Sequence, residues 1–167
     1  MQSLGIAIRM LIGLCSLFSL SACAGGTNAI KESGSYVSSD GQCTAVLKTA
    51  PAGGFLQLYI QTDAKHVSHV ADDITGLAWT TSTSLVFSVS PIYGSPGIFL
   101  VACTKRPSVK MVVSPENIDA AYPKGADFFE LRSVTNNKIE YYYGADVDNI
   151  EFEHFRSKGN LREARLP

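Results

Sequence analysis

The chain has 167 residues, of which 46% are hydrophobic and 17% charged, and its formal net charge is −1. This length favours one domain, and the charged fraction lies below the roughly 25% that is usual in soluble domains. The absence of a basic excess argues against a dedicated nucleic-acid-binding protein. The 10% of aromatic residues argue against a disordered polyelectrolyte.

The first 22 residues have the pattern of an export signal. Arg9 supplies positive charge near the N-terminus, and an uncharged apolar run follows from Met10 to Leu20. This run is shorter than the ~20 residues that a membrane-spanning helix needs. A signal peptide is therefore the better interpretation, and its removal leaves 145 residues.

The signal ends in Leu20-Ser21-Ala22-Cys23, an aliphatic residue and two small residues before a cysteine. This tetrapeptide resembles the lipobox of bacterial lipoproteins. The resemblance implies that Cys23 is diacylglycerylated, that the chain is cut before it, and that the new N-terminus is acylated. Several acyl chains anchor a protein stably, whereas a single chain binds weakly. Ala24, in place of Asp, implies sorting to the outer membrane by the same resemblance. The alternative is an ordinary signal peptide in which Cys23 is incidental.

Residues 23–42 are expected to form a lipidated cysteine and a flexible tether. Eight of the 19 residues from 24 to 42 are Gly or Ser, and the large apolar residues are Ile30, Tyr36 and Val37. Such a composition predicts a flexible chain with a root-mean-square reach of about 25 Å. The tether would let the domain stand away from the lipid surface.

Short runs of alternating apolar and polar residues, separated by turn residues, predict a β domain over 43–155. The runs are rich in β-branched and aromatic residues, which favours antiparallel strands. Asn136-Asn137 suits a two-residue hairpin turn. We therefore expect an all-β fold, either an antiparallel β-sandwich or two packed blade-like sheets. The predicted strands are 42–48, 55–61, 66–70, 77–79, 84–89, 97–103, 109–113, 127–135, 138–144 and 149–155.

Residues 73–103, with Trp79 near the end of one apolar run, resemble a single β-propeller blade of the WD40 or TolB type. A closed propeller of four blades needs about 160 residues, more than the domain offers. Ser114-Pro115-Glu116 has the features of a helix start and predicts one short helical turn near 115–122. The basic end, 156–167, is expected to be a short helix or a frayed tail.

Two of the four cysteines remain for a structural role once Cys15 leaves with the signal and Cys23 takes the lipid. In an oxidising compartment, Cys43 and Cys103 are expected to form a disulfide. The alternatives are a cysteine nucleophile or a metal pair, but neither residue has a ligand at metal-binding spacing.

The sequence carries no catalytic signature, and we expect neither a catalytic residue, nor a metal, nor a cofactor. It lacks S-x-x-K, G-x-S-x-G and H-E-x-x-H patterns and a phosphate-binding glycine loop. His66 and His69 have nearby aspartates, but residues three apart on a strand point to opposite faces. The acidic run 146–153 departs from the EF-hand pattern. His154 is better explained as a structural or edge histidine.

Tyrosines are the candidate interface residues, because their side chains are amphipathic. Tyr141 and Tyr143 share one face of a predicted strand, and Tyr93 lies in a Pro/Gly loop. Packing of Tyr142 into the core, with Tyr141 and Tyr143 covering the sheet, is the structural alternative.

These features predict a non-enzymatic lipoprotein on the periplasmic face of the bacterial outer membrane. Its partners would be the membrane, through the N-terminal lipid, and an envelope protein, with nucleic acid excluded by the compartment. One alternative is an inhibitor or immunity lipoprotein against a lysozyme-like enzyme or secreted toxin, with Tyr93 as an insertion element. An envelope hydrolase that uses carboxylates is the third.

Overall fold

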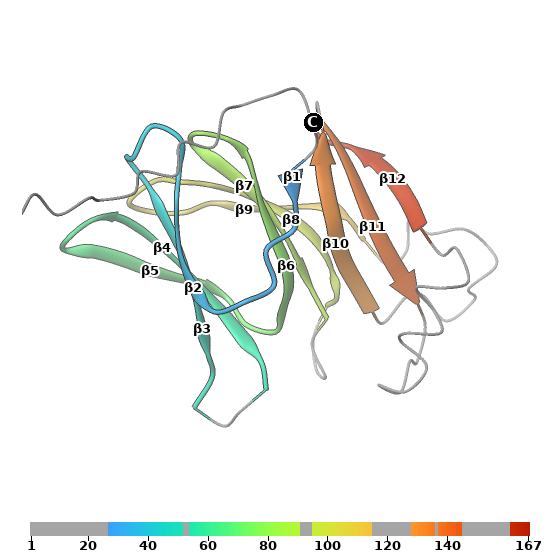
Figure 1. Ribbon diagram of the computed structural model, residues 1–167, viewed down its shortest axis with the longest axis horizontal. Coiled ribbons are helices and arrows are strands. Elements are labelled where there is room, and N and C mark those ends of the chain that lie inside the picture. Colours follow the sequence, from blue (N-terminus) through green and yellow to red (C-terminus); the bar gives the residue numbers. More distant parts are fainter. Residues whose placement is uncertain (1–26, 52–53, 91–94, 115–127, 136, 145–160) are drawn as a thin grey trace, which may run out of the picture.

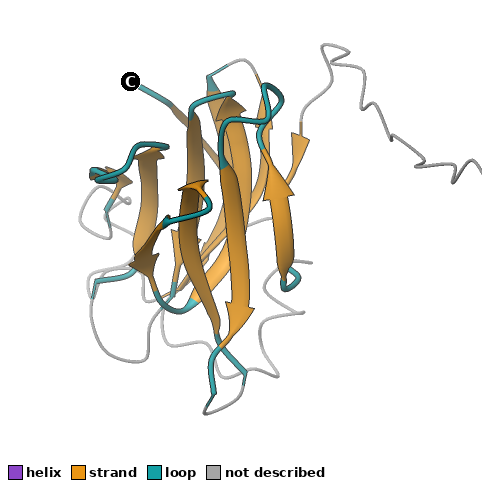
Figure 2. Cartoon of the chain, turned by 90° about the vertical axis from the view of Figure 1, so that its left-hand side faces the viewer, coloured by secondary structure: helices purple, strands orange, loops and turns teal. Residues whose placement is uncertain are grey.

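The computed structural model describes residues 27–51, 54–90, 95–114, 128–135, 137–144 and 161–167 (Figure 1). These residues form strands and loops alone, as Figure 2 shows from the side. The strands make three antiparallel sheets of four strands each. The predicted all-β class is therefore confirmed, with three packed sheets rather than two. Within the described segments, no helix has the length and apolar character required to cross a membrane.

Each sheet follows a simple meander, except that the third recruits a strand from the N-terminal end. The N-terminal sheet contains β2 (Gly34–Val37), β3 (Thr44–Thr49), β4 (Leu56–Asp63) and β5 (His66–Ala71). The central sheet contains β6 (Ile74–Thr81), β7 (Ser84–Val89), β8 (Gly97–Ala102) and β9 (Val109–Val113). The C-terminal sheet has the order β1 (Thr27–Asn28), β10 (Phe128–Thr135), β11 (Lys138–Gly144) and β12 (Leu161–Arg165).

The central sheet is the middle layer, and its strands β6 and β7 carry buried residues on both faces. Leu77, Leu85 and Phe87 pack into one core with inward residues of the N-terminal sheet. Ala78 and Val86 belong to a second core with residues of the C-terminal sheet. A strand covered on both faces needs consecutive apolar residues rather than alternation, and the run from Leu85 to Phe87 supplies them. Full burial of each large apolar side chain contributes about 1.5–3 kcal/mol.

The blade-like segment 73–103 forms three of the four strands of the central sheet. The strands within 73–103 are β6, β7 and β8, and β9 adds the fourth in chain order. Phe87 and Phe99 lie on neighbouring strands, with ring centroids 5.5 Å apart. A four-stranded meander is the strand arrangement that the blade resemblance implies, while the resemblance to a particular family stays a prediction.

The predicted tether from 24 to 42 is wrong for residues 27–42, which join all three sheets. Thr27 pairs with Val134 of β10, and Ile30 exchanges backbone hydrogen bonds of 2.7 and 3.0 Å with Leu77 of β6. The chain then enters β2, which pairs with β3. Backbone pairing needs few large side chains, so a Gly/Ser-rich segment can occupy a strand edge although its composition indicates a linker.

The C-terminal residues also differ from the expected tail or helix. Residues 161–165 form β12, which pairs with β11 along its whole length, from Leu161 opposite Tyr142 to Arg165 opposite Lys138. This strand lies at the edge of its sheet, so its side chains are mainly exposed and show no buried period.

Several predicted features lie outside the described residues. They are the signal and Cys23, Tyr93, the helical turn near 115–122, the strand at 149–155, the acidic run 146–153 and His154.

Candidate interaction surface

The two tyrosines expected at an interface are core residues. Tyr141 is 5% and Tyr143 1% exposed, and both pack in the core between the central and C-terminal sheets. Burial raises the pKa of Tyr141, with a further increase from Tyr143 and a partial decrease from Arg162. The interface expectation for Tyr141 and Tyr143 is therefore wrong, and so is the alternative, because Tyr142 points to the other, half-exposed face.

The predicted disulfide is confirmed. Cys43 directly precedes β3 and Cys103 directly follows β8, with their Cα atoms 6.3 Å apart. The bond joins the N-terminal sheet to the central sheet and closes a loop with a sequence separation of 60. In the chain-entropy model, a loop of this length stabilises the fold by about 4 kcal/mol.

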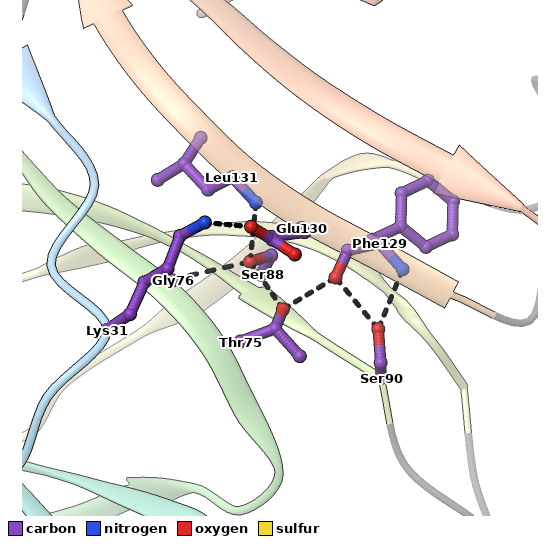
Figure 3. A network of polar contacts seen from close by, with 8 residues as sticks. All are labelled: Lys31, Thr75, Gly76, Ser88, Ser90, Phe129, Glu130 and Leu131. Carbon is purple, nitrogen blue, oxygen red and sulfur yellow. Dashed lines mark hydrogen bonds and ion pairs between the residues drawn. The ribbon is translucent and has the colours of Figure 1, made fainter. Parts of the chain in front are cut away.

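A buried polar junction joins β10 to the central sheet (Figure 3). The Ser88 hydroxyl, in a fully buried residue, accepts a 2.9 Å hydrogen bond from the Leu131 amide. The Ser90 hydroxyl accepts a 2.7 Å bond from the Phe129 amide and donates a 2.8 Å bond to the Phe129 carbonyl. Thr75 also donates to that carbonyl, at 2.5 Å.

The hydroxyls of Ser88 and Ser90 supply hydrogen bonds that β10 would otherwise receive from a neighbouring strand. β1 pairs with Ser133 and Val134 alone, so its two residues leave the edge of β10 near Phe129 and Leu131 uncovered. A buried backbone group without a partner costs about 1–3 kcal/mol, and the hydroxyls remove that cost. The junction is therefore structural.

The carboxylate of Glu130 lies beside this junction. Glu130 is 2% exposed, and the Lys31 ammonium, on the segment between β1 and β2, donates a hydrogen bond to it. A buried carboxylate requires such a partner, because its desolvation is costly. This ion pair fixes the N-terminal segment against β10.

His66 and His69 each contact a nearby aspartate on the surface. The His66 Nδ1 lies 2.7 Å from Oδ2 of Asp63, and the His69 Nε2 lies 3.1 Å from Oδ1 of Asp72. No cluster of three or more potential metal-ligating side chains occurs in the part of the chain that the structure describes.

His69 belongs to a connected polar and aromatic cluster on the N-terminal sheet. Its ring and the Tyr59 ring are steeply inclined to each other, with centroids 5.1 Å apart, and the Lys48 ammonium lies 4.8 Å from the Tyr59 ring centroid. The Tyr59 hydroxyl donates to Gln57 at 3.2 Å, and Gln57 donates to Asp72 at 2.7 Å. Asp72 thus contacts both Gln57 and His69, which fixes the cluster around one tyrosine ring.

This cluster is part of the outer face of the N-terminal sheet, the face opposite the core residues Leu47, Leu58 and Ile60. Two cross-strand rows of this face follow from the register of β2 to β5. One row is Ser35, Val46, Tyr59 and His69, and the other is Val37, Thr44, Gln61 and Val67.

Exposed apolar side chains end the second row. Val37 is 59% and Val67 51% exposed, on the two edge strands of the sheet. The outer face thus combines β-branched apolar residues with an aromatic ring held by polar neighbours. Single exposed apolar residues are common, but Val67 lies on the strand next to Tyr59, opposite Gln61, and this pairing of an apolar residue with an ordered tyrosine suits protein recognition.

A shallow depression of about 250 Å³ lies at the edge of the C-terminal sheet, lined by Lys138, Glu163, Ala164 and Arg165. Lys138 donates a 2.9 Å hydrogen bond to Glu163 there. The depression is open, and two of its four lining side chains, Lys138 and Glu163, form a salt bridge.

The sequence did not identify the outer face. The alternation in 55–61 predicted a strand, but it could not show which face a second sheet covers. Comparison with family models, with curated proteins and with solved structures found no match.

Proposed function

We propose that the protein is a non-enzymatic lipoprotein of the bacterial outer membrane that binds an envelope protein through the outer face of its N-terminal sheet. The location rests on the lipobox-like Leu20-Ser21-Ala22-Cys23 after a charged and an apolar segment. The binding surface rests on one observation: the exposed Val67 and the tyrosine ring of Tyr59 lie in adjacent cross-strand rows of the same face.

The chemistry of the face supports a protein partner. Tyrosine supplies a large contact area at low conformational cost, and interface cores are enriched in aromatic residues. Tyr59 is held by Lys48, His69 and Gln57, so it loses little side-chain freedom on binding.

Site-specific photo-crosslinking in the intact envelope tests the surface. A photoreactive amino acid at Val67 should give one discrete crosslinked product, which mass spectrometry would identify. Lys110 on β9 is the matched control, because it is an exposed strand residue of another sheet. Equal products at the two positions, or no product at Val67, would contradict the assigned surface.

Substitution tests the same surface independently. Tyr59→Ala should reduce the Val67 crosslink while leaving the protein folded, because Tyr59 lies outside both buried cores. The melting temperature serves as the folding control. An unchanged crosslink yield in this variant would show that Tyr59 does not contribute to partner binding.

A further inference from the structure

The point where the fold begins lies close in sequence to the proposed lipid anchor. Thr27 is the first residue of β1, and Cys23 precedes it by four residues. A chain spans at most about 3.3–3.6 Å per residue, so four residues reach at most about 14 Å whatever their conformation. This bound is well below the about 25 Å that the tether expected from the sequence would give.

Thr27 marks one end of the C-terminal sheet. Its partner Val134 directly precedes Thr135, which closes the β10–β11 hairpin against Lys138. Lys138 in turn pairs with Arg165 on β12. Figure 1 shows this end at the top, where β10 ends beside the C-terminal residue. We call Thr27, Thr135, Lys138 and Arg165 the anchor-proximal edge.

The charges of this edge suit a phospholipid surface. Lys138 and Arg165 are neighbouring cations, and both side chains are exposed. Glu163 pairs with Lys138, whose side chain remains 52% exposed. Lys and Arg near an anionic headgroup layer are attracted to it within about one Debye length.

We infer that the anchor-proximal edge lies against the phospholipid headgroups when Cys23 is lipidated, an inference that rests on the proposed lipid anchor. The N-terminal sheet is the farthest layer from the C-terminal sheet, because the central sheet packs between them. In this orientation, membrane contact and partner binding therefore involve different layers of the fold. The C-terminal sheet meets the membrane, and the outer face of the N-terminal sheet stays accessible to a protein partner.

Lipid-to-protein quenching tests this orientation on the full lipidated protein. A fluorophore would be attached to a cysteine at Thr135 in one variant and at Thr49 in another, both being exposed threonines at strand ends. Thr49 ends β3, next to the β3–β4 connection at the bottom of Figure 1. The native Cys43 and Cys103 are joined in the disulfide and do not compete for the label.

Each protein would be reconstituted in vesicles of phosphatidylethanolamine and phosphatidylglycerol that contain a headgroup-labelled nitroxide lipid. Quenching should be several-fold stronger at position 135 than at position 49. Insertion of a 20-residue Gly/Ser spacer before Thr27 should remove most of this difference, because the chain then no longer limits the separation.

The outcomes distinguish this inference from the proposed anchor. A vesicle-bound protein with equal quenching at the two positions would overturn the orientation while leaving lipidation intact. A difference that survives the spacer would keep the orientation and attribute it to Lys138 and Arg165 rather than to the short link. A protein that does not associate with vesicles at all would overturn the lipid anchor, and the orientation with it.

Discussion

Removal of the Ser88 hydroxyl should weaken the junction between the central and C-terminal sheets. Ser88 is fully buried, and its oxygen accepts the hydrogen bond of the Leu131 amide at 2.9 Å. Ser88→Ala leaves that amide without this acceptor at a position that water cannot reach. An unsatisfied buried group costs about 1–3 kcal/mol, so we expect the free energy of unfolding to fall by about 2 kcal/mol.

Urea denaturation of the non-lipidated Cys23→Ser form would measure this loss. The denaturation midpoint should decrease while the m-value stays constant, because the surface exposed on unfolding is unchanged. Ser35→Ala is the matched control, since Ser35 is an exposed serine on β2 and its replacement should change stability by less than about 0.5 kcal/mol. Equal effects of the two substitutions would refute the role given to the junction.

Three further predictions follow from individual contacts. Replacing Cys43 and Cys103 together by serine should lower the free energy of unfolding by about 4 kcal/mol, and the denatured, unreduced native domain should show no free thiol from this pair. Gly76→Ala should destabilise by about 1–3 kcal/mol in thermal unfolding, because its Cβ would lie 2.9 Å from a β10 carbonyl oxygen. Hydrogen bonds from Ser38 and from the Gln42 amide lower the pKa of Asp40, so NMR titration should show that Ser38→Ala raises it. The contribution of Asp40 to stability should be complete above its unfolded pKa of about 3.9 and be lost as the pH falls through the lower folded value.

The alternation of apolar and polar residues predicted most of the strands because it records which face is buried. The segment Leu56–Asp63 forms β4 with Leu58 and Ile60 inward, as period two requires. The same reasoning also placed Tyr141 and Tyr143 on one face of their strand and Tyr142 on the other. It could not show which of the two faces meets another sheet, and the structure buries the pair.

The two ends of the domain were missed for a different reason. β1 and the Ile30 bridge are held by backbone hydrogen bonds, which depend little on side-chain type. β12 lies at a sheet edge and has no fully buried residue, so its sequence carries no apolar period. Edge pairing is a property of the whole sheet, and a local pattern of five residues contains no information about it.

The candidate surface required the same global information. The residues around Tyr59 come from three strands and from the loop that holds Asp72, and their contacts depend on the register of β3, β4 and β5. The disulfide was predictable because Cys43 and Cys103 are the pair that remains once Cys15 and Cys23 are assigned to the predicted signal and lipid anchor, with no reference to strand order.

The central claim is that Cys23 is the lipidated N-terminus of the mature protein. Mass spectrometry of the protein purified from membranes measures this directly. We predict an N-terminal peptide that begins at Cys23 and carries the mass of a diacylglyceryl group and an amide-linked acyl chain. A mature chain that begins elsewhere, or an unmodified Cys23 in the membrane-derived protein, would contradict the account.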